Sequence, residues 1–208
     1  MGTPRKRDRV ARAPSPAMFQ VREKSRLDGA TADLFKLSSM PVLQTQRLTL
    51  REFVSEDLDA LATILSDPET MRYYPAPFDR AAVADWIQRN RIRYANDGYG
   101  LWAMILNSTG ELIGDCGLVR QSVDGRDEIE IGYHVRRDLW GRGYASEAAR
   151  ACRDYGFANL GVDRLISLIR PENLPSRRVA EKNGMTIWKE VTRANLLHYV
   201  YAIKRGQA

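Results

Sequence analysis

The stretch "LWGRGYASEAARACRDYGF", residues 139–157, joins two glycines to an amphipathic pattern. Gly141 and Gly143 stand one residue apart, and glycine lets the backbone adopt a positive φ or approach a ligand closely. Small or apolar residues then follow at helical spacing, at Ala145, Ala148, Ala149, Cys152 and Tyr155 or Gly156. The first turn of a helix carries unpaired N–H groups and a partial positive charge, which together bind anions. The stretch therefore predicts a phosphate-binding loop that opens a helix, with an ordinary tight turn as the alternative.

Two better-known phosphate loops do not fit this stretch. The chain contains no G-x-x-x-x-G-K-[ST], so a Walker A loop is excluded. A Rossmann fingerprint needs a third glycine where Ser146 stands and an acidic residue at the end of the next strand, where Arg170 stands. Arg137 and Arg142 would add positive charge, so pyrophosphate is the predicted ligand.

The segments around the loop indicate a mixed α/β (α+β) domain. Ahead of it we expect a strand in 45–53, a helix over 55–67 with Ser55 as its N-cap, and a helix capped by Asp79. Hairpin-type turns join three strand-like runs, 98–106, 111–119 and 127–135, so these should be antiparallel neighbours. After the loop helix come a strand at 164–170, a short helix at 174–183, and strands at 185–191 and 198–204.

Composition indicates one globular domain. The chain has 208 residues, 44% of them hydrophobic and 28% charged, which is typical of a soluble protein. No apolar run approaches the roughly 20 residues that span a bilayer, and no secretory signal is visible. Cys116 and Cys152 have neither metal-site nor redox-motif spacing, so we expect buried free thiols and a cytoplasmic protein.

The positive charge is concentrated at the start of the chain. Residues 1–40 hold nine Lys or Arg and four Asp or Glu, a net of +5 out of the total of +6. This segment is expected to be a disordered basic extension, followed by the folded domain at 41–208. It is either an arm that binds nucleic acid or an acidic surface, or a dispensable extension ahead of a start at Met18 or Met40. The nearly neutral domain argues against nucleic acid as the main partner.

Several motifs in order resemble the GNAT acetyltransferase superfamily, and within it the branch that acetylates N-terminal alanines of ribosomal proteins. The matching segments are "TQRLTLREF", "GELIGDCGL", "EIEIGYHV", "LWGRGYASEA" and the pattern N-x-x-S-x-x-V-x-x-K-x-G that begins at Asn173. The resemblance covers about residues 43–205. It implies a single domain whose mostly antiparallel sheet has a central, splayed parallel pair and helices on both faces.

The resemblance also implies an acetyl-CoA site where strands 128–135 and 164–170 splay apart, with no metal. The pantetheine arm would pair with the backbone of Tyr133, His134 and Val135. The pyrophosphate would bind the amides of Trp140, Gly141, Arg142, Gly143, Tyr144 and Ala145. Asn173 and Ser176 would reach the far side of the arm. Trp140 stands where the family often has Gln or Arg, which removes a charged contact and leaves the amides in place.

The implied chemistry is direct attack of an amine on a thioester, without a covalent enzyme. Many members place a Tyr acid four residues after the Ser176 position, where this chain has Ala180. Ser176 is then the predicted donor to the leaving thiolate, or else it only caps the short helix or bonds the pantetheine. Glu130 is the predicted base, on the same side of its strand as His134, or else a structural carboxylate paired with an arginine. His134 and His198 are interpreted as satisfied residues and not as bases.

An aromatic segment offers an acceptor pocket at Tyr73, Tyr74 and Phe78, whereas Trp86 and Trp102 are expected in the core. About a tenth of free α-amines are neutral at pH 7, against well under a thousandth of lysines, which favours a peptide α-amine or a small amine. Three functions remain open: an acetyl-CoA-dependent N-acetyltransferase, a catalytically silent acyl-CoA-binding module, and a nucleic-acid binder. The protein would act as a monomer or homodimer, and the sequence does not identify the acceptor.

Overall fold

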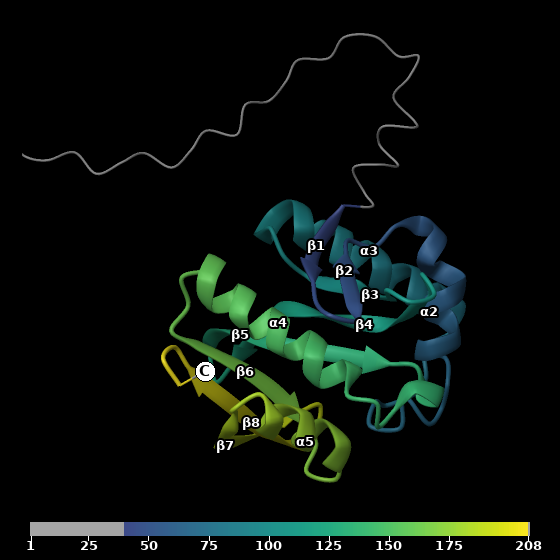
Figure 1. Ribbon diagram of the computed structural model, residues 1–208. Helices are drawn as coiled ribbons and strands as arrows, with labels where there is room; N and C mark the ends of the chain where they lie inside the picture. Colours follow the sequence, from purple (N-terminus) through teal and green to yellow (C-terminus); the bar gives the residue numbers. More distant parts are fainter. Residues whose placement is uncertain (1–39, 208) are drawn as a thin grey trace, which may run out of the picture.

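The computed structural model describes residues 40–207, which form one eight-stranded sheet with helices on both faces (Figure 1). The strands are β1 (Pro41–Gln44), β2 (Leu48–Arg51), β3 (Leu101–Leu106), β4 (Leu112–Val123), β5 (Arg126–Val135), β6 (Arg164–Ile169), β7 (Thr186–Arg193) and β8 (Leu196–Lys204). The helices are α2 (Leu58–Leu65), α3 (Arg80–Asp97), α4 (Tyr144–Asn159) and α5 (Leu174–Lys182), with 3-10 turns η1 (Ser55–Asp57) and η2 (Arg137–Leu139). The predicted fold class is confirmed, and β1 is a strand that the sequence did not predict.

Backbone pairing in the sheet is nearly lost between one pair of neighbouring strands. The strand order is β1-β2-β3-β4-β5-β6-β8-β7, and every neighbouring pair is antiparallel except β5 with β6. These two parallel strands share a single backbone pairing, Glu130 with Ile166. Within β5, the residues beyond Glu130 pair only with β4. The edge of β5 that faces β6 is therefore open from Ile131 onward, as the family resemblance implied.

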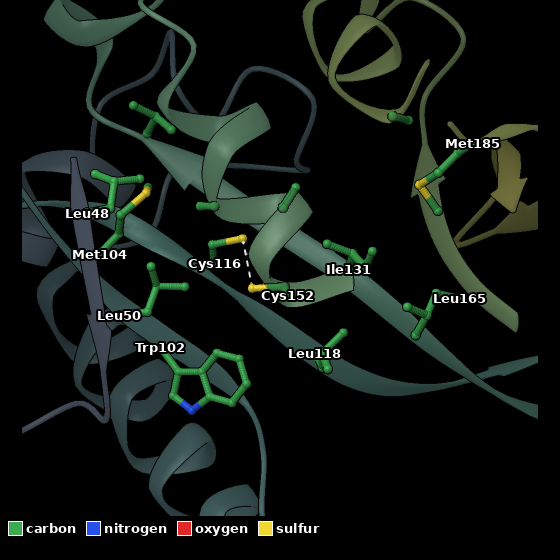
Figure 2. Close-up of a cluster of buried hydrophobic side chains, with 14 of the residues drawn as sticks. Leu48, Leu50, Trp102, Met104, Cys116, Leu118, Ile131, Cys152, Leu165 and Met185 are labelled. Atoms are coloured by element: carbon green, nitrogen blue, oxygen red, sulfur yellow. Dashed lines mark hydrogen bonds between the residues drawn. The ribbon is translucent and has the colours of Figure 1, made fainter. Parts of the chain in front are cut away.

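Helix α4 covers one face of the sheet through the predicted apolar stripe. Ala148, Ala149 and Cys152 are buried, and Cys152 packs against strand β4, where its sulfur lies 3.5 Å from that of Cys116 (Figure 2). Both cysteines are free, which confirms the predicted buried thiols. Burial raises the pKa of the Cys116 thiol, so it stays protonated and acts as a small apolar group.

Helices α2 and α3 form a second core on the opposite face, around Leu61, Val83 and Ile87. Helix α3 starts as predicted, because the Asp79 carboxylate accepts a hydrogen bond from the Ala82 N–H at 2.8 Å. The prediction of Ser55 as the N-cap of one helix over 55–67 is wrong.

That segment begins with the separate turn η1, and Asp57 takes the capping position of α2. The Asp57 carboxylate accepts from the Val54 N–H at 2.9 Å and pairs with Arg51 at 2.7 Å. This ion pair holds a carboxylate that is only 5% exposed, and a serine hydroxyl could not replace it.

Among the described residues, no helix is both long and apolar enough to cross a membrane. The predicted basic extension, residues 1–40, lies outside the described residues except for Met40. The predicted domain boundary at residue 41 coincides with the start of β1 at Pro41, and the boundary itself stays a prediction.

Candidate active site

A cavity of about 780 Å³ opens where β5 and β6 separate. Its wall combines the segment 69–75, the open edge of β5, the turn before α4, the end of β6 and the first turns of α5. The cavity therefore reaches from the helix α4 face of the sheet, through the gap, to the side where α2 and α3 lie. A ligand bound here can contact both faces of the sheet at once.

The loop before α4 forms one end of this cavity. Gly141 (φ 76°) and Gly143 (φ 84°) both have left-handed backbone conformations, which strongly favour glycine. Gly143 is the N-cap of α4, and no side chain from residues 40–207 caps that end. Its first N–H groups remain available to a ligand. The predicted residues Trp140, Gly141, Gly143, Tyr144 and Ala145 all line the cavity.

The two arginines predicted to add charge at this loop do not line the cavity. Arg137 lies in a neighbouring hollow beside Thr70, and the Arg142 side chain is exposed. Arg47, which does not line the cavity either, also contacts the loop: it donates to the Arg142 carbonyl at 2.9 Å and lies over the Tyr144 ring at 4.5 Å. Sequence reasoning missed Arg47 because it lies 95 residues away from Arg142 in the chain.

Glu147 in the first turn of α4 fixes Arg47 and the β1–β2 turn to the loop. Its carboxylate accepts from the Thr45 hydroxyl at 2.6 Å, the Arg47 N–H at 2.9 Å and the Arg47 guanidinium at 2.6 Å. Burial alone would raise the pKa of Glu147, but these three donors outweigh it and lower the pKa. The carboxylate thus stays ionised at neutral pH and anchors this end of the cavity.

At the gap between the strands, side chains replace the missing backbone pairs. The Glu130 carboxylate accepts from the Leu168 N–H at 3.1 Å and from the Gln121 amide at 2.7 Å. The Ser167 hydroxyl donates to the Ile131 carbonyl at 2.8 Å. Glu130 forms no ion pair with any described arginine, so the alternative of an Arg-paired carboxylate is not observed. Burial raises the pKa of Glu130, which makes it a stronger base than an exposed carboxylate.

The predicted pantetheine-binding residues Tyr133, His134 and Val135 form the wall along the open edge of β5. The Trp140 indole donates to the Val135 carbonyl at 2.7 Å, so Trp140 is held by the strand and not by a ligand. The Tyr133 hydroxyl donates to the Ser176 carbonyl at 2.9 Å and ties β5 to α5. These contacts keep the edge of β5 in a fixed position beside the cavity.

Helix α5 presents Asn173 and Ser176 to the same cavity. The Asn173 side chain is the N-cap of α5 and accepts from the Ser176 N–H at 3.2 Å. The suggestion that Ser176 only caps this helix is therefore wrong, because Asn173 has that role. Ala180 is buried, so no hydroxyl occupies the position of the acid found in many family members.

The wall of the cavity on the side of α2 and α3 contains a chain of polar contacts. His134 approaches the Asp115 carboxylate with Nδ1 at 2.7 Å and the Tyr74 hydroxyl with Nε2 at 2.8 Å. The Trp86 indole donates to the other Asp115 oxygen at 2.9 Å. Tyr73 crosses the cavity mouth, where its hydroxyl donates to the Glu172 carbonyl at 3.1 Å.

Of the three predicted acceptor-pocket residues, Tyr73 and Tyr74 line the cavity and Phe78 does not. Phe78 packs behind them, with its ring centroid 5.6 Å from that of Trp86 and 6.1 Å from that of Tyr74. Trp102 lies in the core as predicted, whereas Trp86 is only partly buried and uses its N–H on Asp115. Both histidines have partners, as interpreted from the sequence, since His198 Nδ1 lies 2.9 Å from the Leu196 carbonyl.

Asp115 is a site residue that the sequence reasoning missed. It has no exposed surface and lies in the otherwise apolar run "LIGDCGLV". A carboxylate in such a strand must have buried partners, because an unpaired buried charge is very costly. That signal was present in the sequence, although it identifies neither His134 nor Trp86 as the partner.

Comparison of the sequence with known proteins identifies the family to which this chain belongs. The model of the acetyltransferase (GNAT) domain matches residues 47–186. A Bacillus licheniformis relative named as an uncharacterized N-acetyltransferase, p20, is 38% identical over 154 residues, covering 73% of this chain and 84% of that protein.

Solved structures agree with this match. The crystal structure of a GNAT-family acetyltransferase from Bacillus anthracis is 31% identical, with a TM-score of 0.67, covering 78% of this chain and 97% of that one. A ribosomal-protein-S5-alanine acetyltransferase from Vibrio fischeri is 14% identical with a TM-score of 0.62, covers 79% of this chain and 96% of that one, and shows the shared fold alone. On the family-model match and these relatives, the chain belongs to the GNAT family of acetyltransferases and is an N-acetyltransferase.

Proposed function

We propose that this enzyme transfers the acetyl group of acetyl-CoA to a peptide α-amine or another small primary amine, by direct attack within the cavity. One observation carries the proposal. A single cavity joins the uncapped start of α4 on one face of the sheet to Glu130 and Tyr74 on the other, through the gap between β5 and β6.

The residues present fit acetyl-CoA. Two left-handed glycines and the uncapped N–H groups of α4 suit a pyrophosphate, with Arg47 as a nearby cation. The open edge of β5 presents backbone groups of Tyr133 to an extended arm, as an added strand would require, whereas the Val135 carbonyl is already bonded by the Trp140 indole. Arg178 and Lys182 add positive charge on the α5 wall. By this proposal the thioester lies at the gap, between Ser176 and Glu130.

The amine then approaches from the side of Tyr73 and Tyr74. Glu130 accepts a hydrogen bond from it and orients its lone pair toward the thioester carbonyl. The N–C bond forms, the C–S bond breaks, and the proton that the attacking nitrogen loses as it becomes an amide passes to the departing sulfur, so CoA leaves as a thiol. Ser176 donates a hydrogen bond to the departing sulfur, because a hydroxyl is too weak an acid to protonate a thiolate of pKa about 8.5 outright.

A catalytically silent acyl-CoA-binding module is the second candidate, and Ala180 is the observation that favours it. A buried alanine at this position removes the acid used by many family members. Both candidates require the same cavity and the same ligand, so binding does not distinguish them. Only turnover does.

The deciding experiment follows the release of CoA thiol from acetyl-CoA with pooled amines: Ala- and Ser-starting peptides, amino acids, polyamines and aminoglycosides. We expect release with the peptide or small-amine pools. We expect Ser176→Ala to lower kcat about 10-fold, while Ser122→Ala, an exposed serine outside the cavity, serves as the matched control. No release from any pool, with acetyl-CoA still raising the melting temperature, would favour the silent module.

A further inference from the structure

The contacts of His134 form a directed hydrogen-bond chain that ends in the cavity. Asp115 has no exposed surface and the His134 side chain is 8% exposed, so this pair is shielded from water. Tyr74, by contrast, is 40% exposed and lies in the segment between α2 and α3. The chain therefore runs from a buried carboxylate, through an imidazole, to a hydroxyl at the cavity wall.

The partners of Asp115 fix the direction of this chain. Its carboxylate accepts from the His134 backbone N–H at 3.1 Å and from the Trp86 indole, and both of these groups can only donate. An ionised carboxylate also requires a donor at Nδ1 of His134, which in the neutral imidazole, the form that can take up a proton, leaves Nε2 as the acceptor. The Tyr74 hydroxyl consequently donates to Nε2, and its oxygen lone pairs are free to accept from a group in the cavity.

The electrostatics suit a proton acceptor at His134. Burial alone lowers the pKa of His134, but the charge and hydrogen bond of Asp115, with a smaller effect of Glu130, raise it above its ordinary value. Although 40% of Tyr74 is exposed, enclosure of its hydroxyl beside His134 raises its pKa, and the charges of Glu130 and Asp115 add to this, so Tyr74 stays a neutral phenol. The groups that face His134 are thus Asp115 from β4, Glu130 from β5 and Tyr74, with the uncharged ring of Trp86 from α3.

We propose that Tyr74, His134 and Asp115 form a proton relay that deprotonates the acceptor amine, an inference that rests on the proposed acetyl transfer. The bound ammonium gives a proton to the Tyr74 oxygen while Tyr74 gives its own proton to Nε2 of His134. The amine becomes neutral, Tyr74 keeps a hydroxyl, and the new imidazolium is paired with Asp115. The proton returns by the same route to water at the exposed edge of Tyr74 once the amide has formed. Tyr74 is the catalytic residue of this relay, and Asp115 is a positioning residue.

The relay explains features that a purely structural role leaves unexplained. Asp115 is already satisfied by the Trp86 indole and a backbone N–H, so the fold does not need an imidazole there. The relay also provides a base for the acceptor, which is needed because about nine-tenths of α-amines are protonated at pH 7. Glu130 has two donors of its own and is left with the role of orienting the amine.

The test compares kcat/KM from pH 6 to pH 10 for the acceptor identified in the amine panel, using the full chain. We expect His134→Gln and Tyr74→Phe each to lower kcat/KM at pH 7 by about 30- to 100-fold. This loss of kcat/KM should shrink to a few-fold at pH values above the pKa of the acceptor amine, because most of the amine is then already neutral in solution. Asp115→Asn should behave like His134→Gln, since an amide at this site no longer enforces the tautomer that accepts from Tyr74.

The controls separate the relay from folding and from the proposed function. His198→Gln should keep the wild-type pH dependence although His198 also lines the cavity, because its Nδ1 lies at the Leu196 carbonyl and no carboxylate of residues 40–207 bonds it. Tyr155→Phe, on the buried side of α4, is the match for Tyr74→Phe. The increase in melting temperature caused by CoA should be retained in every variant. The relay is overturned if His134→Gln and Tyr74→Phe lower kcat/KM at pH 7 by less than 3-fold, or lower it equally at all pH values. A wild-type protein that acetylates none of the amines overturns both proposals.

Discussion

The two halves of the cavity are built in different ways. The half at α4 comes mainly from one continuous stretch, Trp140 to Ser146, whose shape depends on two glycines and a helix terminus. The half on the opposite face is assembled from four separate segments, which contribute Tyr73 and Tyr74, Asp115, Glu130 and His134, and Glu172. One half relies on the backbone, and the other relies on side chains that meet across the fold.

This difference decides how each half tolerates change. Backbone N–H groups are present whatever the side chains are, so the α4 half is sensitive to conformation and little else. The opposite half depends on individual oxygen and nitrogen atoms, so single substitutions can alter its chemistry without disturbing the fold. We therefore expect the α4 half to bind one invariant ligand portion and the opposite half to determine the acceptor.

The strongest test of this comparison is a conformational change in the α4 half. Gly143→Val should weaken CoA binding about 10- to 100-fold, because a β-branched residue at a φ of 84° costs about 1–3 kcal/mol and displaces the loop. Isothermal titration with CoA measures this. Gly110→Val is the matched control: Gly110 also has a left-handed φ of 75°, but it lies in the β3–β4 turn with open space around it. Equal loss of CoA affinity in both variants would show that the effect is general destabilisation.

A smaller effect is expected when one side chain of the opposite half is changed. Tyr73→Phe removes the hydroxyl that donates to the Glu172 carbonyl and should raise the KM for the acceptor about 2- to 10-fold. The affinity for CoA should change little, because none of the hydrogen bonds of Tyr73 reaches the loop before α4. Steady-state kinetics with the acceptor and CoA titration measure the two effects separately. If CoA affinity fell as much as acceptor affinity, the two halves would not be independent.

The smallest expected effect concerns the anchor of the α4 half and depends on pH. Glu147 has a lowered pKa in the folded protein, so its contribution to stability is present above its unfolded pKa of about 4.5 and is lost as pH falls through the folded value. Glu147→Gln should thus lower the melting temperature at pH 7 by roughly 2–4 °C, equivalent to about 1 kcal/mol. The difference from wild type should shrink as the pH falls below about 4.5 and Glu147 becomes protonated. Thermal unfolding followed by circular dichroism between pH 7 and pH 3 checks this, and a difference that does not shrink over that range would contradict it.

The same contrast explains how much could be predicted from the sequence. Gly141, Gly143 and the helix stripe are neighbours in the chain, so their spacing predicted a glycine turn that opens a helix, and hairpin turns predicted the order β3-β4-β5. The choice of a phosphate loop over an ordinary tight turn rested on the family resemblance and stays a prediction. The pairing of His134 with Asp115 and of Arg47 with Glu147 joins residues 19 and 100 positions apart. No local pattern encodes such contacts. Phe78 was misplaced for the same reason, because the sequence puts it near Tyr74 but does not say which ring faces the cavity.

The single pairing of Glu130 with Ile166 has a mechanical consequence. It divides the sheet into two plates, β1–β5 and β6–β8, which are joined by one backbone pairing, by side-chain hydrogen bonds such as that of Ser167 to the Ile131 carbonyl, and by the hydrophobic core that they share beneath α4. An acyl-CoA arm along the open edge of β5 would act as the missing strand and lock the plates together. Amide hydrogens of β6 and β8 should then exchange more slowly with solvent, and proteases should cut the chain more slowly, whenever the ligand is abundant. Binding of the ligand would in this way hold the two plates together as well as position the thioester.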